Sequence, residues 1–525
     1  MRAHHRISHR LKIGIGIVVL GLISLAIAGC SSSPSGSGGS ASKLVVAIAA
    51  DPPTLDVMTS TQNVTQQIGY NIFEGLFAPD ANFKPSPMLV DTYHYDEASK
   101  TYTFKLRSGV PFHNGHILDS ADVVASLNRW LKLSTYAQSI AGDVVSVTAA
   151  DKLTVEMKLK EDSALVLTAL TFPNQQAAIY PASVIKAAGD QPVTQFIGTG
   201  PFKFDSQQVG VGTKLSSFAD YKARDDAPSG MAGKRVADVD QLEFKSIPEA
   251  SVRLDNLTTG AVQIADSLDS DMYDQIKSNP DIVPTIIKPY QWPTAVFNKA
   301  QPPFDDVRVR QAFLASLDMG QIMQGAFSSD QFYRLDPSIM AVEFKQWWSD
   351  AGSQYYNHPD PEHAKQLLAE SGYNNEPIVW LTTRDYPYMY TIAETAAQQL
   401  KAVGFNIKLE VVDFATIGTR RAVKTGWNIY STALGDTDPG NFAYLSAAAP
   451  GWWVDPHKDD LVHQLNTTID PAARKKIWDE IQLYFWQQVP LIKFADVFSL
   501  AATDKSVSGY VPALFPVYWG VSVNG

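Results

Sequence analysis

Two hydrophobic periodicities along the chain predict both strands and helices. Residues 101–107 and 153–159 alternate apolar and polar positions, which is the pattern of strands with one buried and one solvated face. A short apolar run within 43–50 predicts another strand, and the Asp-Pro-Pro sequence at 51–53 predicts the turn that ends it.

Several helices are marked by their terminal residues. Asp360 followed by proline predicts a helix start, and Gly372 predicts its end. Asp470 followed by proline predicts a second start of the same kind. A third helix is expected over about 392–403, directly before a strand at 406–412. Helices that alternate with strands indicate an α/β layered architecture.

The first thirty residues have the pattern of an export signal. A basic start precedes an apolar run at 13–28, which is short for a membrane span of roughly 20 residues. The run ends at Ile27-Ala28-Gly29-Cys30, which resembles the lipobox of bacterial lipoproteins. That resemblance implies a signal peptide over 1–29 and a lipid on the thiol of Cys30. The alternative is an uncleaved membrane anchor.

A Ser/Gly-rich tract follows this cysteine and predicts a flexible linker over 30–42. Such a tract cannot order itself by burying apolar surface, and twelve residues span on the order of 20 Å. Cys30 is the only cysteine, so the mature protein has none for disulfides and depends on core burial. We expect a domain tethered beside a membrane, in a periplasm or on an outer cell surface.

Chain length and net charge indicate the number of domains and exclude some classes of partner. A chain of 525 residues predicts two or three domains. Removal of the four basic residues in 1–29 lowers the 43 Lys and Arg to 39, against 54 Asp and Glu, for a net charge of −15. This charge argues against nucleic acid and anionic lipid as partners.

A series of short motifs runs through nearly the whole mature chain. Together they resemble the peptide- and oligopeptide-binding proteins of ABC importers, extracellular solute-binding protein family 5. The motifs lie at 51–56, 72–77, 102–107, 109–115, 120–124, 198–202, 302–304, 308–312, 360–373 and 436–442.

The resemblance implies an α/β two-lobe periplasmic-binding-protein fold of class II type, cluster C, with an extra subdomain on the first lobe. The implied limits are 43–80, 200–291 and 501–525 for lobe I, 81–199 for the extra subdomain and 292–500 for lobe II. It also implies lobe closure around a peptide-like ligand and delivery to ABC importer permease subunits with a cytoplasmic ATPase. We expect a monomer.

A zwitterionic peptide needs a carboxylate for its amine and a cation for its carboxylate. The resemblance places an acid near 431–442, where Asp436 and Asp438 are the candidates, although this stretch lacks the family's usual tryptophan. The alternative is that both acids only form a turn. Arg384 is the candidate cation, and a surface ion pair with Asp385 is its alternative role.

Aromatic residues are further candidates because flat rings can hold ligand side chains or sugar rings. Trp452 and Trp453 are adjacent in a Pro/Gly-rich loop, and we expect them not to face one core. Thr54 and Asn298, from the segments at 51–56 and 294–298, complete the predicted contacts. The other aromatic candidates are Trp292, Tyr386, Tyr388 and Trp427.

Motifs for catalysis are missing from the sequence. It has no Gly-x-Ser-x-Gly elbow, zinc-protease motif, phosphate loop or dinucleotide fingerprint. His113 and His116 flank an Asn-Gly turn without a third ligand nearby, so we expect no metal. We therefore expect a binding protein without cofactor, and not an enzyme. The alternatives are the same scaffold with an oligosaccharide, an opine-like conjugate or a metal chelate, and a surface adhesin or sensor module.

Overall fold

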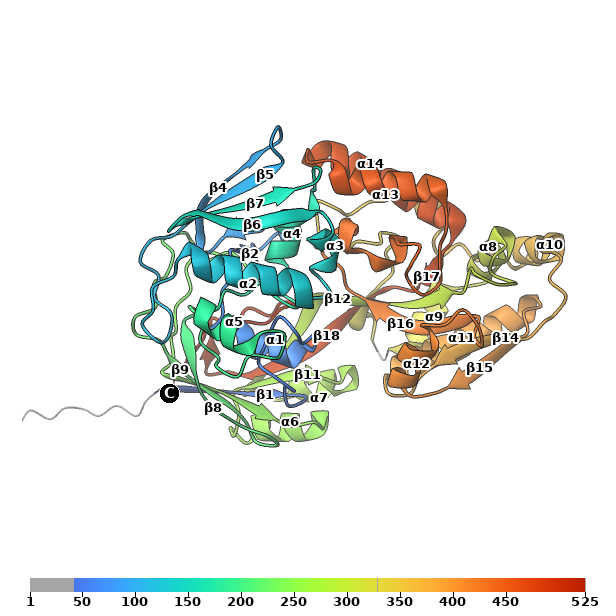
Figure 1. Ribbon diagram of the computed structural model, residues 1–525. Helices are drawn as coiled ribbons and strands as arrows, with labels where there is room; N and C mark the ends of the chain where they lie inside the picture. The colour runs from blue at the N-terminus through green and yellow to red at the C-terminus, as the bar shows by residue number, and fades with distance from the viewer. Residues whose placement is uncertain (1–41, 328, 525) are drawn as a thin grey trace, which may run out of the picture. The chain divides into compact units, whose positions relative to one another are not determined.

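The longest strand, β12 (Ile282–Phe297), joins two halves of one mixed sheet in the computed structural model, which describes residues 42–327 and 329–524. Residues 282–291 of this strand pair with β18 (Asp496–Asp504), and residues 292–297 pair with β16 (Ile429–Leu434). Both β12 and β18 therefore belong to the connection between the halves (Figure 1).

On one side of β18 the sheet continues through β11, β1, β10, β9 and β8, and helices pack beside these strands. The strands are β1 (Lys43–Ile48), β8 (Phe202–Gln208), β9 (Gly212–Ser217), β10 (Gln241–Ser246) and β11 (Ile264–Leu268). The helices are α1 (Asn63–Ile72), α6 (Ala250–Thr258) and α7 (Tyr273–Ser278).

A separate antiparallel sheet of order β4-β5-β7-β6 is packed against α2. Its alternating strand β5 is buried at every second residue, as the sequence predicts. The strands are β4 (Val90–Asp96), β5 (Thr101–Leu106), β6 (Val144–Asp151) and β7 (Thr154–Leu159), with the hairpin β2 (Phe77–Pro79) and β3 (Pro85–Pro87) close by. The helices are α2 (Ser120–Leu133), α3 (Gln138–Ala141), α4 (Leu165–Thr171) and α5 (Ala182–Ala188).

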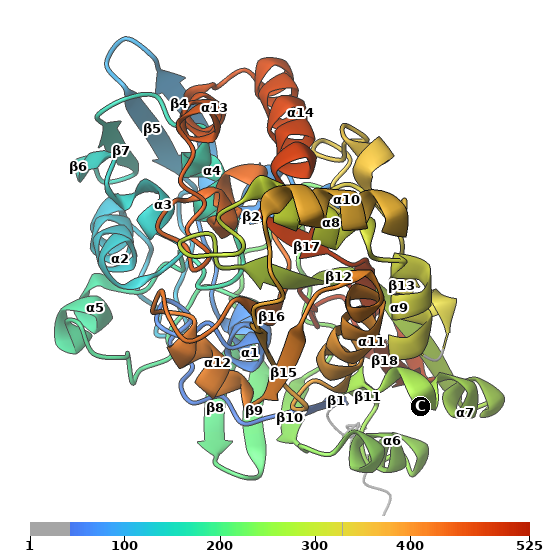
Figure 2. The same cartoon turned by 90° about the vertical axis from the view of Figure 1, so that its right-hand side faces the viewer.

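Beyond β16 the sheet ends with β14 and β15, and Figure 2 shows α8 beside α10 and α9 beside α11 in this half. The remaining strands are β13 (Tyr333–Arg334), β14 (Ile378–Thr382), β15 (Ile407–Val411), β17 (Leu491–Lys493), β19 (Val507–Ser508) and β20 (Ser522–Val523). The helices are α8 (Val307–Ala315), α9 (Met319–Ala326), α10 (Pro361–Ser371), α11 (Pro387–Val403), α12 (Phe414–Arg420), α13 (Pro456–Thr467) and α14 (Pro471–Gln488).

The buried apolar residues form three clusters that explain this division. One cluster takes residues from 44–264 and 518–521, and another takes residues from 292–497. Strand β1 is buried on both faces, because Leu44, Val46 and Ile48 enter the first cluster while Val45 and Ala47 enter a third. We call the parts around the first and third clusters the first lobe, and the part around the 292–497 cluster the second lobe.

The predicted α/β, two-lobe class is confirmed, and the helix caps are as expected. Asp360 caps α10 by accepting a hydrogen bond from the His363 amide, and Gly372 ends it in the left-handed conformation. The numerical lobe limits stay a prediction, because the first cluster runs continuously through 43–80 and 81–199. Among the described residues, no helix is long and apolar enough to cross a bilayer. The predicted signal peptide and Cys30 lie outside those residues.

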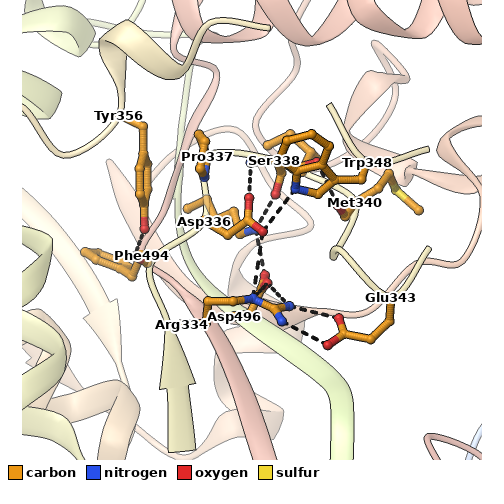
Figure 3. A network of polar contacts seen from close by, with 12 residues as sticks. Arg334, Asp336, Pro337, Ser338, Met340, Glu343, Trp348, Tyr356, Phe494 and Asp496 are labelled. Carbon is orange, nitrogen blue, oxygen red and sulfur yellow. Dashed lines mark hydrogen bonds and ion pairs between the residues drawn. The ribbon is translucent and has the colours of Figure 1, made fainter. Parts of the chain in front are cut away.

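A polar network fixes the second lobe to the start of β18 (Figure 3). Arg334 donates to Asp496 at 2.6 Å and to Glu343 at 2.8 and 2.9 Å. Lys493 is completely buried and lies 2.7 Å from the other Asp496 oxygen. The carboxylate of Asp496 thus compensates two cations at the point where the chain returns to the first lobe.

Candidate functional site

The two acids predicted as ligand anchors have different surroundings. Asp438 is 3% exposed and accepts hydrogen bonds of 2.8 and 2.6 Å from Arg474. It also accepts from the Gly440 amide at 2.9 Å. Asp436, two residues earlier, has no side-chain hydrogen bond or ion pair with any described residue. Asp438 is therefore occupied within the protein, whereas the Asp436 carboxylate is available to a ligand.

The Asp436 carboxylate lies where the lobes meet. Burial, and then the negative charge of Asp438, raise its pKa to about 7. Burial raises the pKa of Tyr136, a first-lobe residue, and the negative charge of Asp436 raises it further. Burial and the charge of Asp436 also raise the pKa of Tyr444, in the second lobe. An acid of the second lobe thus faces a tyrosine of the first.

Arg421 of the second lobe supplies a positive charge beside Tyr430 and Tyr444, and it was not among the residues selected from the sequence. Its guanidinium carbon lies 5.4 Å from the centre of the Tyr430 ring, and the Tyr430 and Tyr444 hydroxyls are 2.7 Å apart. Its charge lowers the pKa of Tyr444, whereas that of Asp436 raises it. Arg421 forms no ion pair with a carboxylate among the described residues. Its signal in the sequence was only a basic pair, Arg420-Arg421, at the end of a helix.

A line of aromatic rings runs from Tyr136 along the first lobe. The Tyr136 and Phe172 rings stack at 3.9 Å, Phe172 contacts Phe515 at 5.8 Å, and Phe515 contacts Tyr70 at 6.3 Å. Phe515 lines two hollows, one of about 20 Å³ beside Asp438 and one of about 70 Å³ beside Tyr70. Thr437 and Asp438 of the second lobe line the first of these hollows together with first-lobe residues, so this hollow lies between the lobes. We call the line of rings with its two hollows the trough.

The lobes are in contact across this trough. The Ala164 amide donates to the Asn466 carbonyl at 2.8 Å, and Phe83 packs edge-on against Phe344 at 4.6 Å. Each of these pairs joins a first-lobe residue to a second-lobe residue. This arrangement corresponds to a closed cleft.

Tyr386 and Tyr388 lie together at a larger hollow of about 580 Å³. Tyr388 is largely buried, and its hydroxyl accepts from Gln291 at 2.9 Å. Tyr386 is 44% exposed and contacts the edge of Phe414. Residues of both lobes line this hollow, so two predicted aromatics do border interlobe space.

Arg384 and Thr54 have local partners. The Arg384 guanidinium lies 4.0 Å from the centre of the Tyr390 ring, and Asp385 instead accepts from the Phe414 amide. The expected alternative of an Arg384–Asp385 pair is therefore not what the structure shows. The Thr54 hydroxyl accepts from the Asp56 amide at 3.0 Å, as in a turn.

Three other predicted contacts are buried in the second lobe. Asn298 is completely buried and donates to the Lys424 and Trp427 carbonyls at 3.0 and 3.1 Å. Trp427 is 1% exposed, and its indole donates to the Val423 carbonyl. Trp292 is 4% exposed and packs 5.8 Å from Phe442. The side chains of these three residues thus bind or pack against other residues of the protein.

The expectation that Trp452 and Trp453 do not face one core is wrong. Trp453 is buried in the second-lobe cluster and stacks on Tyr484 at 6.1 Å. Trp452 packs partly against the same cluster and lies 5.8 Å from Trp427. A positive φ of 47° at Trp452 turns the chain so that both rings can reach this core.

Comparison with known proteins agrees with this architecture. A sequence profile described as "Bacterial extracellular solute-binding proteins, family 5 Middle" matches residues 84–453. A probable peptide ABC transporter periplasmic-binding protein, y4tO of Sinorhizobium fredii, is 27% identical over 92% of this chain and 94% of its own. The glutathione-binding protein GsiB of Escherichia coli K12 is 24% identical over 90% and 92%.

Two solved structures share the fold. AgaA from A. tumefacien R10, in complex with agropinic acid, is 24% identical with a TM-score of 0.75, covering 92% of this chain and 99% of its own. A dipeptide-binding protein from Pseudoalteromonas sp. SM9913 in complex with Met-Leu is 22% identical with a TM-score of 0.73, covering 91% and 98%.

The fold is that of the two-lobe solute-binding proteins. The chain belongs to the bacterial extracellular solute-binding proteins of family 5. It is thus an extracytoplasmic binding component of an ABC importer, which works with permease and ATPase subunits. Proteins of this class bind and deliver solutes and are not enzymes.

Proposed function

We propose that this protein captures a short peptide-like zwitterion in the trough between its lobes. The observation that carries the proposal is Asp436, an acid at the lobe junction with a pKa of about 7 and no partner among the described residues. A ligand ammonium would bind this carboxylate through a charge-assisted hydrogen bond. The bound amine would also favour the closed form, because it bridges Asp436 and first-lobe groups such as Tyr136.

For the other end of the ligand we propose Arg421. Its guanidinium lies near Tyr430, its charge and that of Asp436 both act on Tyr444, and it has no acidic partner among the described residues. Arg384, the sequence-based candidate, is exposed and stacked on Tyr390. An amine on Asp436 and a carboxylate on Arg421 would fix the ligand main chain. The hollow beside Tyr386 and Tyr388 would take a side chain.

A direct test is native mass spectrometry of freshly purified protein, followed by calorimetry with di-, tri- and tetrapeptides. We expect free peptides to bind, and N-acetylated peptides to bind at least about tenfold more weakly because they have no ammonium. Equal binding of free and acetylated peptides would contradict the role of Asp436. If no peptide binds, the peptide proposal is wrong, whereas the assignment to the solute-binding family is unaffected.

An opine-like conjugate is the second candidate ligand. The fold shared with AgaA, whose structure contains agropinic acid, favours this alternative. The Asp436–Arg421 pair accommodates any compact amino acid derivative with both charges. Calorimetry with amino acid–sugar conjugates beside the peptide panel separates the two classes, since the tighter class identifies the ligand.

For membrane attachment we propose a lipid on Cys30. The proposal is based on the sequence Ile27-Ala28-Gly29-Cys30 and the Ser/Gly-rich tract that follows it. With residues 1–29 removed, the first strand at Lys43 would begin a short tether away from the membrane. Detergent phase partitioning tests this directly: the wild type should enter the detergent phase, and Cys30→Ala should remain in the aqueous phase. Aqueous partitioning of both would contradict lipidation.

A further inference from the structure

A second buried acid, Asp266, lies beside the trough in the first lobe. It is 9% exposed and borders the hollow of about 70 Å³ together with Tyr70, Tyr290 and Phe515. Phe515 and Tyr70 are also the last rings of the aromatic line that begins at Tyr136 near Asp436. Asp436 and Asp266 therefore lie toward opposite ends of one aromatic line, on different lobes.

Asp266 has no cationic partner among the described residues. Its oxygens accept from the Ser267 amide at 2.9 Å and from the Gln67 side chain at 3.0 Å. Arg253 is the nearby cation, but its guanidinium donates to the main-chain carbonyls of Asp266, Ile247, Pro248 and Ser267. The carboxylate itself forms no ion pair in the described part of the chain. Neutral donors thus hold a buried acid whose negative charge is not matched by a salt bridge.

Local backbone geometry positions this carboxylate. The pairing of β11 with β18 is irregular between Ala265 and Leu268, and Ser267 within it has a φ of 54°. Bulges of this kind change the direction of a side chain, and a positive φ at serine costs free energy. Asp266 and Ser267 both border the hollow as a result.

We propose that Asp266 and the rings around it bind a second cationic group, such as a lysine- or arginine-type side chain of the ligand. This rests on the proposed function, since the ligand amine is taken to occupy Asp436. Aromatic walls with a carboxylate at the end suit a cation on an apolar stem, because the rings contact the stem and attract the charge. A hollow of about 70 Å³ gives room for the end of one such side chain.

The surroundings of Asp266 support this assignment. Burial raises its pKa, while the hydrogen bonds from Ser267 and Gln67 and the charge of Arg253 act in the opposite direction. Its charge contributes to the raised pKa of Tyr290, which is about 12, and acts on Tyr510 and Tyr518 in the same direction. A cation in the hollow would stabilise the ionised carboxylate and lower its pKa again.

The test compares peptides that differ only by a terminal ammonium. Lys-Ala-Ala, Ala-Lys-Ala and Ala-Ala-Lys are each measured by calorimetry against the twin in which norleucine replaces lysine. We expect the lysine form of at least one pair to bind about tenfold tighter or more, because a buried charge-assisted hydrogen bond is gained. Equal affinities in all three pairs would overturn the inference but leave peptide binding intact. If none of the peptides binds, the proposed function fails and this inference fails with it.

Asp266→Asn is the matching variant, because asparagine keeps the shape and removes the charge. It should reduce the lysine preference to about unity and leave the norleucine peptides within about twofold of wild type. Asp255→Asn is the control, since Asp255 is exposed on α6, borders neither the hollow of about 70 Å³ nor that of about 580 Å³, and should keep the preference. A preference that survives Asp266→Asn would overturn the assignment.

A wild-type measurement covers the case in which Asp266→Asn does not fold. The lysine-to-norleucine affinity ratio should decrease as the pH falls, because protonation of Asp266 removes the attraction. The charged and titratable groups around it, Arg253, Tyr290, Tyr510 and Tyr518, keep their charge state between about pH 5 and 8. Asp436 titrates in this range but acts equally on both twins, so its effect cancels in the ratio. A ratio above one that stays constant as the pH is lowered, for as long as the protein remains folded, would contradict the role of Asp266.

Discussion

Asp438 and Arg474 form two parallel hydrogen bonds of 2.6 and 2.8 Å within the second lobe, and this pair occupies one of two neighbouring acids. The Asp438 oxygens are further used by the Gly440 amide at 2.9 Å and the Thr168 hydroxyl at 3.4 Å. Asp436 has no such partner in the described residues. One acid of the Asp-Thr-Asp turn therefore holds the protein together, and the other is available at the cleft.

Removal of the Asp438 charge should destabilise the protein. Asp438→Asn leaves the guanidinium of Arg474, whose side chain is 6% exposed, without its counter-ion, which typically costs about 3–5 kcal/mol. Urea unfolding should show this as a clear fall of the midpoint. Asp436→Asn is the matched comparison and should keep or raise the midpoint, because it removes an uncompensated charge. It should also weaken binding of free peptides. The opposite order of stabilities would refute this assignment of roles.

The stability of the unliganded protein should depend on pH through Asp436. Its folded-state pKa of about 7 is above its unfolded value of about 4, so the folded state retains a proton that the unfolded chain has lost. As the pH rises from about 4 to 7, the free energy of unfolding should therefore fall by at most about 1.4 kcal/mol per pH unit. Above about pH 7 this contribution should level off. The difference in melting temperature between wild type and Asp436→Asn across this range isolates it. A difference that does not vary with pH would be evidence against it.

Peptide affinity should change with pH in the opposite direction. In the proposed complex the ligand ammonium binds the ionised form of Asp436, so affinity should increase up to about pH 7 and decrease again where the ligand amine loses its proton, near pH 8. Calorimetry at constant ionic strength gives the profile. In Asp436→Asn the rise toward pH 7 should disappear, and a profile that keeps this rise would assign it to another group.

Local sequence signals predicted much of the fold because they act over a few residues. The proline at 361 and Gly372 gave the limits of α10, and alternation gave β5. The start of α11 was missed by five residues, because it begins at Pro387 in a Tyr-Pro sequence without a capping side chain. Burial of both faces of β1 depends on two clusters whose members lie as much as 477 positions apart (Leu44 and Val521), which no local pattern reveals.

The site was only partly predictable for the same reason. Asp436 and Asp438 are equivalent in the sequence, and only the fold brings Arg474, 36 positions later, to one of them. Asp266 is a single acid in a strand, and its exposure to the trough depends on Phe515 from the other end of the chain. Trp292 and Trp427 were selected as aromatics, but their rings fill the second-lobe core.

The two candidate cations can be separated by mutation. Arg421→Ala should weaken binding of peptides with a free carboxylate by about tenfold or more and should not affect peptides with a C-terminal amide. Arg384→Ala, in which the exposed Arg384–Tyr390 stack is lost, should leave both affinities nearly unchanged. If instead only Arg384→Ala shows the carboxylate effect, the anchor is Arg384 as the sequence suggested.

Closure of the lobes should depend on the absence of a side chain at Gly440. A Cβ there would lie 2.3 Å from Leu165 Cδ2 of the first lobe, and 2.8 Å from both Arg474 and Asn466. Gly440→Ala should thus disfavour the closed form and weaken peptide binding by about tenfold, since affinity scales with the population of the competent state. In solution scattering, the decrease in radius of gyration on ligand addition should become smaller.

The second lobe alone could also be disturbed by this change, so the closure effect needs its own control. Leu165→Ala combined with Gly440→Ala should restore most of the affinity, because it removes the clash between the lobes and leaves the contacts with Arg474 and Asn466 unchanged. Gly418→Ala, with no atom within 4 Å of the added Cβ, should bind like wild type. If the double variant remains as weak as Gly440→Ala, the loss comes from within the second lobe, and closure against Leu165 is not what limits binding.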